Sequence, residues 1–340
     1  MFAHQVVDFI GPAGVHWNEI REPEAGDGVI IHVVAAGVSF ADLLQTQGRY
    51  QLNLVLPFTP GMDAAGVVRS APPGAGIRAG QRVAVLLSHG CWQEVLAADP
   101  RRVLALPDDL SFEAGAAAPL NYLTGLFALV RRGRAQAGET LLVHGGAGGV
   151  GVAAIQLGRA LGLQTIAVTS DDHKRNFALR CGAHHAILSD GWLDAVRGLV
   201  GDRAVDIVVD PVGGDRMTDS LRSLAPEGRL LVLGFTAGEI PTPAATVESG
   251  AFTITSLLER ARCTSHTNAE SPPLPPRGVC STSRSAQLNT TRCWSIPNRA
   301  SLGPSGRYTV GGTTMSPPRN GRSTIGSPRT ARTSSAKRAS

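Results

Sequence analysis

The chain has 340 residues, of which 43% are hydrophobic and 17% are charged, an ordinary balance for a soluble globular protein. It has no run of about 20 apolar residues, no basic segment ahead of an apolar one near Met1, and five Cys without paired spacing. These properties argue against a transmembrane helix, a signal peptide and a disulfide framework, so we expect a cytoplasmic protein of two domains with no membrane partner.

Residues 1–110 predict short strands separated by Pro- and Gly-rich turns. Three runs are apolar and rich in β-branched residues, and they cover 29–35, 66–69 and 83–87. We therefore assign residues 1–115 to a mostly β domain. Residues 111–137 follow as two helical pieces broken at Pro119, with Ser111 as the N-cap.

Residues 138–243 alternate between strand and helix patterns. The predicted strands cover 140–144, 165–169, 186–188, 205–210 and 230–234. The predicted helices cover 150–161, 172–181, 192–199 and 217–224. Alternation at these lengths is typical of a doubly wound parallel sheet, so we assign residues 116–243 to an α/β domain of that class.

A glycine turn joins the first of these strands to its helix. Gly146, Gly148 and Gly151 fit the pattern G-x-G-x-x-G, which lets the pyrophosphate of a dinucleotide approach the backbone at a helix N-terminus. The alternative is a Gly-rich loop without a ligand. The contacts expected in this turn are Gly146, Gly148, Gly149, Val150 and Gly151.

The end of the second strand predicts which dinucleotide is bound. Enzymes that use NAD usually carry an acidic residue there, which binds the ribose 2′-hydroxyl. This chain has Thr169 and Ser170, which can donate to a 2′-phosphate, and Lys174 follows as the only lysine before residue 243. Asp171 and Asp172 would disfavour a phosphate, but they suit the start of a helix. The sequence therefore favours NADP(H) over NAD(H).

Two later loops follow the carboxyl ends of predicted strands, where open α/β sheets bind ligands. They cover 210–215 and 234–238, and ordinary turns are the alternative. The cofactor contacts expected in them are Pro211, Val212, Gly213, Gly234, Phe235 and Thr236.

The segment 138–159 carries a longer pattern: Gly followed by an acidic residue, then Leu, a Gly-rich turn, and Gln three residues before a basic residue. Its members are Gly138, Glu139, Leu142, Gly146, Ala147, Gly148, Gly149, Gly151, Gln156 and Arg159. This pattern resembles the signature of the zinc-free quinone oxidoreductase (zeta-crystallin-like) branch of the medium-chain dehydrogenase/reductase superfamily. The resemblance extends over about residues 6–241, including the segments 35–50, 56–68 and 76–86.

The resemblance implies a GroES-like substrate domain ahead of a Rossmann domain, and NADPH-dependent hydride transfer to a quinone or an α,β-unsaturated carbonyl compound. It also implies a homodimer that acts on a small molecule. By the same resemblance, Ser39, Asp42 and Tyr50 line the pocket, Asn121 and Thr124 lie beside the nicotinamide, and Ser189 lies near the adenosine phosphate.

No metal is expected. The related zinc alcohol dehydrogenases carry a Cys and a Gly-His-Glu sequence where this chain has Ser39 and Gly61-Met62-Asp63. A catalytic zinc needs about three converging N, S or O ligands, and these residues do not supply them. Two alternatives to a quinone reductase stay open: an NADPH-binding protein that is non-catalytic or unstable, and an enoyl-thioester reductase.

Composition changes abruptly after residue 243. Residues 1–243 contain 19 basic and 24 acidic residues, a net charge of −5, whereas residues 244–340 contain 13 basic and 3 acidic residues, a net charge of +10. This second part is rich in Ser, Thr, Pro and Arg, so we expect a disordered or aberrant tail. A shifted reading frame is the leading hypothesis, and the last strand of the second domain is then missing. A natural disordered tail is the alternative, and scattered Arg without interleaved aromatic residues argues against a nucleic-acid partner.

Overall fold

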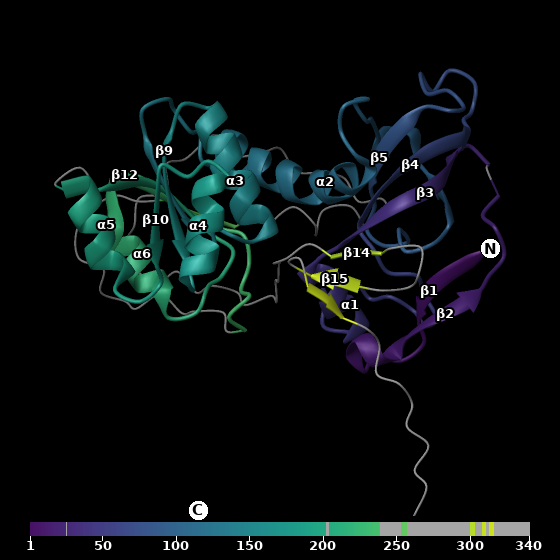
Figure 1. The fold of residues 1–340 in the computed structure, drawn as a ribbon, viewed down its shortest axis with the longest axis horizontal. Coiled ribbons are helices and arrows are strands. Elements are labelled where there is room, and N and C mark those ends of the chain that lie inside the picture. The colour runs from purple at the N-terminus through teal and green to yellow at the C-terminus, as the bar shows by residue number, and fades with distance from the viewer. Residues whose placement is uncertain are drawn as a thin grey trace, which may run out of the picture.

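The computed structural model describes residues 1–24, 26–201 and 204–238, together with four short strands at 253–256, 300–302, 308–310 and 313–315. The described chain forms two lobes, and the long helix α2 (Phe112–Leu126) runs between them (Figure 1). The expected disordered or frame-shifted tail otherwise lies outside the described residues. The expected order of a β lobe followed by a parallel-sheet α/β lobe is confirmed.

The first lobe is built on an antiparallel sheet with the strand order β16-β15-β14-β3-β4-β5-β7. The strand β6 pairs with residues 29–32 of β3, whereas β14 pairs with its residues 37 and 38. Ile31, Val68, Val83 and Leu96 are buried at its centre, which explains the apolar β-branched runs of the sequence. Its strands are β3 (Val29–Val38), β4 (Asp63–Ser70), β5 (Arg82–Leu86), β6 (Val95–Ala98), β7 (Val103–Ala105), β14 (Ala300–Leu302), β15 (Tyr308–Val310) and β16 (Thr313–Met315).

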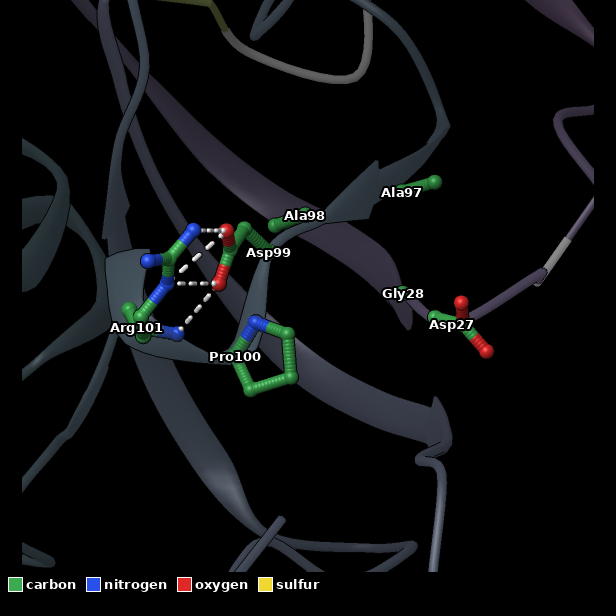
Figure 2. Close-up of a pocket in the computed structure, with 7 residues that line it drawn as sticks. All are labelled: Asp27, Gly28, Ala97, Ala98, Asp99, Pro100 and Arg101. Carbon is green, nitrogen blue, oxygen red and sulfur yellow. Dashed lines mark hydrogen bonds and ion pairs between the residues drawn. The ribbon is translucent and has the colours of Figure 1, made fainter.

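Short elements complete this lobe. They are the antiparallel pair β1 (Phe2–Val6) and β2 (Val15–Glu19), the 3-10 helices Gly11–Gly14 and Pro100–Arg102, and the helix α1 (Phe40–Thr46). A shallow hollow on this lobe is lined by Asp27, Gly28, Ala97, Ala98, Asp99, Pro100 and Arg101 (Figure 2). Hydrogen bonds from Arg101 hold Asp99 there and lower the pKa of its carboxyl to about 2. No residue predicted for the functional site lines this hollow.

The second lobe is a parallel sheet of six strands in the order β10-β9-β8-β11-β12-β13, with helices on both faces (Figure 1). Along β8, Leu141 and Val143 belong to one core cluster and Leu142 to another, so both faces of the strand are buried. The strands are β8 (Thr140–His144), β9 (Gln164–Thr169), β10 (His185–Leu188), β11 (Val205–Asp210), β12 (Leu224–Val232) and β13 (Thr253–Ser256). The helices are α3 (Gly149–Ala160), α4 (Asp172–Arg180), α5 (Trp192–Val200) and α6 (Arg216–Ser223).

The structure corrects the expectation of a break in the connecting helix. Helix α2 continues through Pro119 and passes into a π-helix (Phe127–Arg132). The carboxylate of Asp63, from the first lobe, accepts a hydrogen bond from the Leu120 N–H at 3.4 Å just after the proline, where the helix lacks a donor. A contact from a distant segment therefore supports the helix at the point where the local sequence predicts its end.

The prediction that the last strand is missing is wrong for residues 253–256. They form β13, which pairs in parallel with β12 at the edge of the sheet, and β14 pairs with β3 in the first lobe. Thr253, Ile254 and Thr255 are β-branched, but the run is too short to stand out from its surroundings. The strand β12 also begins earlier than predicted, at Leu224.

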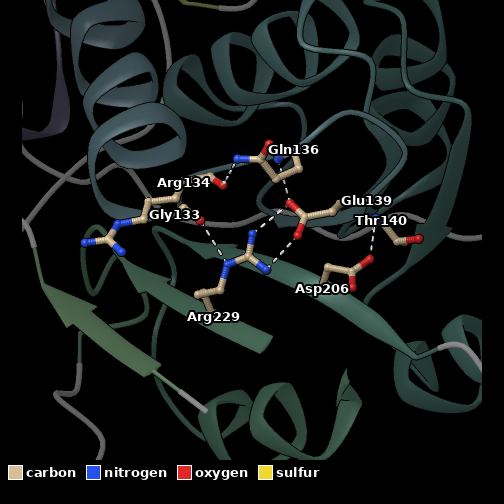
Figure 3. A network of polar contacts seen from close by, with 7 residues as sticks. All are labelled: Gly133, Arg134, Gln136, Glu139, Thr140, Asp206 and Arg229. Atoms are coloured by element: carbon tan, nitrogen blue, oxygen red, sulfur yellow. Dashed lines mark hydrogen bonds and ion pairs between the residues drawn. The ribbon is translucent and has the colours of Figure 1, made fainter. Parts of the chain in front are cut away.

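A network of ion pairs and hydrogen bonds joins the amino ends of the central strands (Figure 3). Arg229 of β12 donates to both carboxylate oxygens of Glu139, at 2.8 and 2.7 Å, and to the carbonyl oxygen of Gly133 at 2.9 Å. Both side chains are mostly buried, with 17% and 21% of their surface exposed. The acidic residue of the signature pattern therefore connects the start of β8 to β12.

Replacing Glu139 by Gln should lower the free energy of unfolding by about 1–3 kcal/mol at neutral pH, because two charge-assisted hydrogen bonds are weakened. Burial would raise the pKa of Glu139, but its hydrogen bonds from Arg229 and the Gln136 N–H leave that pKa below its ordinary value. The pair therefore stabilises the fold above the unfolded-state pKa and loses this contribution as the pH falls through the lower folded-state pKa. Urea unfolding of the full chain should show the difference between Glu139→Gln and the parent shrinking in acid.

Asp194→Asn is the matched control, because the Arg197–Asp194 pair lies in the open, with 55% and 89% of the two side chains exposed. Its effect should stay within about 0.5 kcal/mol. Equal effects of the two substitutions would contradict the role given to the Arg229–Glu139 pair.

Candidate functional site

The glycine turn lies between the end of β8 and the start of α3, which has Gly148 as its N-cap. A Cβ atom on Gly146 would stand 2.6 Å from the Cβ of Ala167, and one on Gly151 would stand 2.2 Å from the Gly145 carbonyl oxygen. Both positions therefore exclude a side chain, and the first N–H groups of α3 have no partner within the helix. Bare backbone with N–H groups at a helix N-terminus fits the pyrophosphate of a dinucleotide. The five predicted contacts in this turn thus lie together, with Val150 presenting only its backbone because its side chain is buried.

Helix α2 borders this turn through Asn121. A Cβ atom on Gly149 would stand 2.5 Å from Asn121 Oδ1, so the amide side chain lies directly against the glycine turn. Its Nδ2 donates to the Ala117 carbonyl oxygen at 2.8 Å, while its Oδ1 is buried without a hydrogen-bond partner among the described residues. The half-buried Thr124 lies almost one helical turn further along. Asn121 can therefore offer an acceptor to a bound molecule.

Ser170 and Lys174 meet at the carboxyl end of β9. The Lys174 Nζ donates to the Ser170 Oγ at 2.8 Å, and about half of the lysine side chain is exposed. Asp171 also touches both groups: it accepts from the Ser170 hydroxyl at 2.9 Å and lies 3.5 Å from Lys174 Nζ. Its other oxygen accepts from the Lys174 N–H and begins α4, which confirms its role as an N-cap.

Thr169, the last residue of β9, and Ser189, which directly follows β10, lie beside that pair. The Thr169 hydroxyl is buried and donates to the carbonyl oxygens of Ile187 and Asp171, at 3.3 and 3.4 Å. The Ser189 N–H donates to the Thr169 carbonyl oxygen at 2.7 Å. The exposed hydroxyl at this end of β9 is therefore that of Ser170.

The two later loops pack on each other and on the glycine turn. The Thr236 and Ala237 N–H groups donate to the carbonyl oxygens of Pro211 and Val212, at 3.3 and 2.9 Å. Gly213 has a φ of 66°, and a Cβ atom there would stand 2.5 Å from a ring carbon of Phe235. The structure thus brings together the residues predicted in these loops, which are Pro211, Val212, Gly213, Gly234, Phe235 and Thr236.

Asp210 holds the first of these loops in place, and sequence analysis did not identify it. Its Oδ1 accepts from the N–H groups of Val212 and Gly213, at 2.8 and 2.9 Å. A strand that ends in Asp followed by Pro and Gly is a pattern that could have predicted this turn.

In the first lobe, Ser39 and Asp42 form a buried capping box at the start of α1. The backbone N–H and the hydroxyl of Ser39 both donate to Asp42 Oδ2, at 2.7 and 2.6 Å. Burial raises the pKa of Asp42 to about 6, although these hydrogen bonds lower it. Asp42 has no exposed surface, and Tyr50, half-buried against the core cluster that contains Val150, is the more accessible of the three predicted pocket residues.

Asp63 occupies the position where a zinc ligand would be needed. Burial, followed by repulsion from Asp42, raises the pKa of Asp63 to about 8, so its carboxyl holds a proton at neutral pH. No group of three or more His, Cys, Asp or Glu that could bind a metal ion is found among the described residues. In the same part of the chain, no helix is long and apolar enough to cross a membrane.

Comparison with known proteins gives matches to both lobes. Residues 25–108 match the alcohol dehydrogenase GroES-like domain, and residues 149–267 match the zinc-binding dehydrogenase family. The chain is 37% identical to quinone oxidoreductase-like protein 2 of Bos taurus over 239 residues, which cover 69% of this chain and 66% of the bovine protein. It spans 62–66% of the length of the bovine, mouse and rat forms of that protein.

Solved structures of oxidoreductases also match about three quarters of this chain. A probable oxidoreductase from Mycobacterium abscessus is 40% identical, with a TM-score of 0.69 and coverage of 75% of this chain and 79% of that one. The quinone oxidoreductase of Thermus thermophilus, solved alone and with NADPH, is 32% identical, with a TM-score of 0.66 and coverage of 77% and 81%.

The close approach of Gly151 to the Gly145 carbonyl oxygen can be tested by adding a side chain at this position. Gly151→Ala should destabilise the chain by about 1–3 kcal/mol, because the added Cβ would overlap a backbone oxygen that cannot move aside. Gly198→Ala in α5 is the control: nothing lies within 4 Å of its added Cβ, so the change should be neutral or stabilise the helix by up to ~1 kcal/mol. Thermal unfolding of both variants measures the difference, and a harmless Gly151→Ala would disprove the close contact.

Proposed function

We propose that this chain, which belongs to the quinone oxidoreductase-like members of the medium-chain dehydrogenase/reductase superfamily, is an NADPH-dependent reductase of quinones or α,β-unsaturated carbonyl compounds that works without zinc. NADPH would supply a hydride to the substrate. The observation that carries the proposal is the Ser170–Lys174 pair at the end of β9, where enzymes that use NAD usually carry an acidic residue for the ribose hydroxyl. Asp171 lies beside this pair, and its Oδ1 accepts from the Lys174 N–H at the start of α4. The Thermus protein, solved with NADPH, supports the same cofactor.

The residues divide into two groups by the part of the cofactor they face. The glycine turn would hold the pyrophosphate, and Ser170 and Lys174 the 2′-phosphate, with Ser189 beside them. Asn121 and the loops at 211–213 and 234–236 would border the nicotinamide end, where Asn121 Oδ1 offers a buried acceptor. Thr124 would complete this side from α2.

The substrate proposal rests on the side chains of the first lobe. The Ser39 hydroxyl donates to Asp42, and Asp63 accepts from the Leu120 N–H. Met62 has no charge, so Ser39, Met62 and Asp63 do not form a set of zinc ligands. A carbonyl compound that is already electrophilic accepts hydride with positioning and a few hydrogen bonds. Tyr50 would donate one of these to the oxygen on which charge develops. Cytoplasmic location and a homodimer belong to the same proposal.

Lys174→Ala should weaken NADPH binding by about 1–3 kcal/mol and leave NADH binding nearly unchanged, because only NADPH presents a phosphate to this side chain. Arg175→Ala is the control, since Arg175 lies next on α4 and pairs with Asp172 at 3.0 Å. Titrations that follow nucleotide fluorescence measure both affinities. Equal losses for NADPH and NADH in Lys174→Ala would remove this residue from the phosphate site.

Exhaustive chelation should leave the reduction of a quinone and of an enone unchanged. The expectation follows from Ser39, Met62 and Asp63 at the positions where zinc ligands would be needed. The assay compares NADPH oxidation before and after treatment, with and without added zinc. Activity that disappears on chelation and returns with zinc would refute the zinc-free mechanism.

A further inference from the structure

A buried cluster of polar side chains lies beneath the candidate site, and none of its members was predicted from the sequence. His144 is the last residue of β8, and Asp210 is the last residue of the neighbouring strand β11. These strands are parallel, with Val143 opposite Val209, so the next residue of each strand projects to the same face of the sheet. Ser220, from α6, completes the cluster, and all three side chains have no exposed surface.

Polar atoms in and beside this cluster lack hydrogen-bond partners among the described residues, and Arg216 Nε at the start of α6 is one of them. His144 Nε2 lies 2.9 Å from the Ser220 hydroxyl, and the imidazole meets the Trp192 ring edge-on at 4.7 Å between centroids. On the other side of the ring, His144 Nδ1 is buried without a hydrogen-bond partner among the described residues, and so is Asp210 Oδ2. Burying polar atoms without hydrogen-bond partners is unfavourable, so these two atoms should pair directly or through one buried water.

The pairing also determines which ring nitrogen carries the proton. Burial lowers the pKa of His144 to about 4, so the imidazole is neutral at physiological pH and has a single N–H. The Ser220 hydroxyl can donate to Nε2, whereas the Asp210 carboxylate can only accept. The arrangement is complete when Nδ1 holds the proton.

We propose that His144 is a positioning residue for the cofactor: its Nδ1–H is donated to Asp210 Oδ2, directly or through one water, and so ties the end of β8 to the loop 211–213. The other oxygen of Asp210 already holds the Val212 and Gly213 N–H groups. The Val212 side chain packs closely against the glycine turn: a Cβ atom on Gly145 would stand 3.1 Å from Val212 Cγ2. The link therefore fixes the nicotinamide side of the site. This inference rests on the proposed NADPH binding.

Two substitutions of His144 separate its two nitrogen atoms. His144→Asn places an amide N–H near the position of Nδ1 and keeps the donor toward Asp210. His144→Gln places its amide near Nε2 and keeps only the contact with Ser220. We expect the dissociation constant for NADPH to rise about tenfold in His144→Gln and less than about threefold in His144→Asn. Ser220→Ala, which leaves the Nδ1 side intact, should resemble His144→Asn.

Adenosine 2′,5′-bisphosphate is the second probe, because it occupies only the adenosine side of the site. Its affinity should not change in any of the three variants. If His144→Gln binds NADPH as tightly as the parent, or if it loses both nucleotides equally, the positioning role is wrong. If the parent itself binds the bisphosphate but not NADPH, the proposed function fails at the nicotinamide side.

The protonated nitrogen can be tested without any cofactor. In protein labelled with ¹⁵N-histidine, the His144 signal is the one that disappears in His144→Asn and does not titrate near neutral pH. We expect the chemical shifts of an imidazole protonated at Nδ1. Protonation at Nε2 would overturn the proposal whether or not NADPH binds.

Discussion

The second lobe depends on how closely the helix α3 approaches the sheet. Gly146 and Gly151 let the helix begin directly against β9 and the preceding turn, at distances that no side chain permits. The same closeness continues on the outer side of α3, where a Cβ atom on Gly125 of α2 would stand 3.0 Å from a methyl carbon of Leu157. A small residue thus holds helix α2 against α3, and α2 carries Asn121 to the glycine turn. Because α2 also packs on the strands of the first lobe, one steric constraint positions parts of both lobes.

The two lobes are connected by a second, electrostatic feature. Asp63 begins β4 in the first lobe, yet its carboxyl reaches the α2 backbone at the point where Pro119 removes a donor. Asp42 lies close enough to Asp63 to raise its pKa, so ionisation of one of these buried carboxyls disfavours ionisation of the other. The capping of α1, the continuity of α2 and the protonation of these two groups are therefore linked. A substitution at either carboxyl would be felt at the substrate side and at the cofactor side.

Local patterns predicted most of the α/β lobe, but contacts between distant segments could not be predicted. The strands β8, β9 and β11 and the helices α3 and α4 begin within about one residue of their predicted starts, because apolar periodicity and caps are local signals. The contact between Ser170 and Lys174 is also local, because the two residues are only four apart in the sequence. In contrast, Glu139 and Arg229 are 90 residues apart and His144 and Ser220 are 76 apart, so only the folded chain reveals their pairing. The helix through Pro119 escaped prediction for the same reason, since its support comes from Asp63.

The rarity of lysine gives the proposed cofactor site an unusual chemical property. Lys174 is the only lysine before residue 243, and its side chain is about half exposed beside Ser170. An amine-directed acylating reagent therefore meets only two primary amines in that part of the chain, this side chain and the α-amino group of Met1. The α-amino group donates to the Ile20 carbonyl oxygen at 3.1 Å, far along the sequence from β9. The yield of acylation at Lys174 thus measures how often a bound anion shields the carboxyl end of β9.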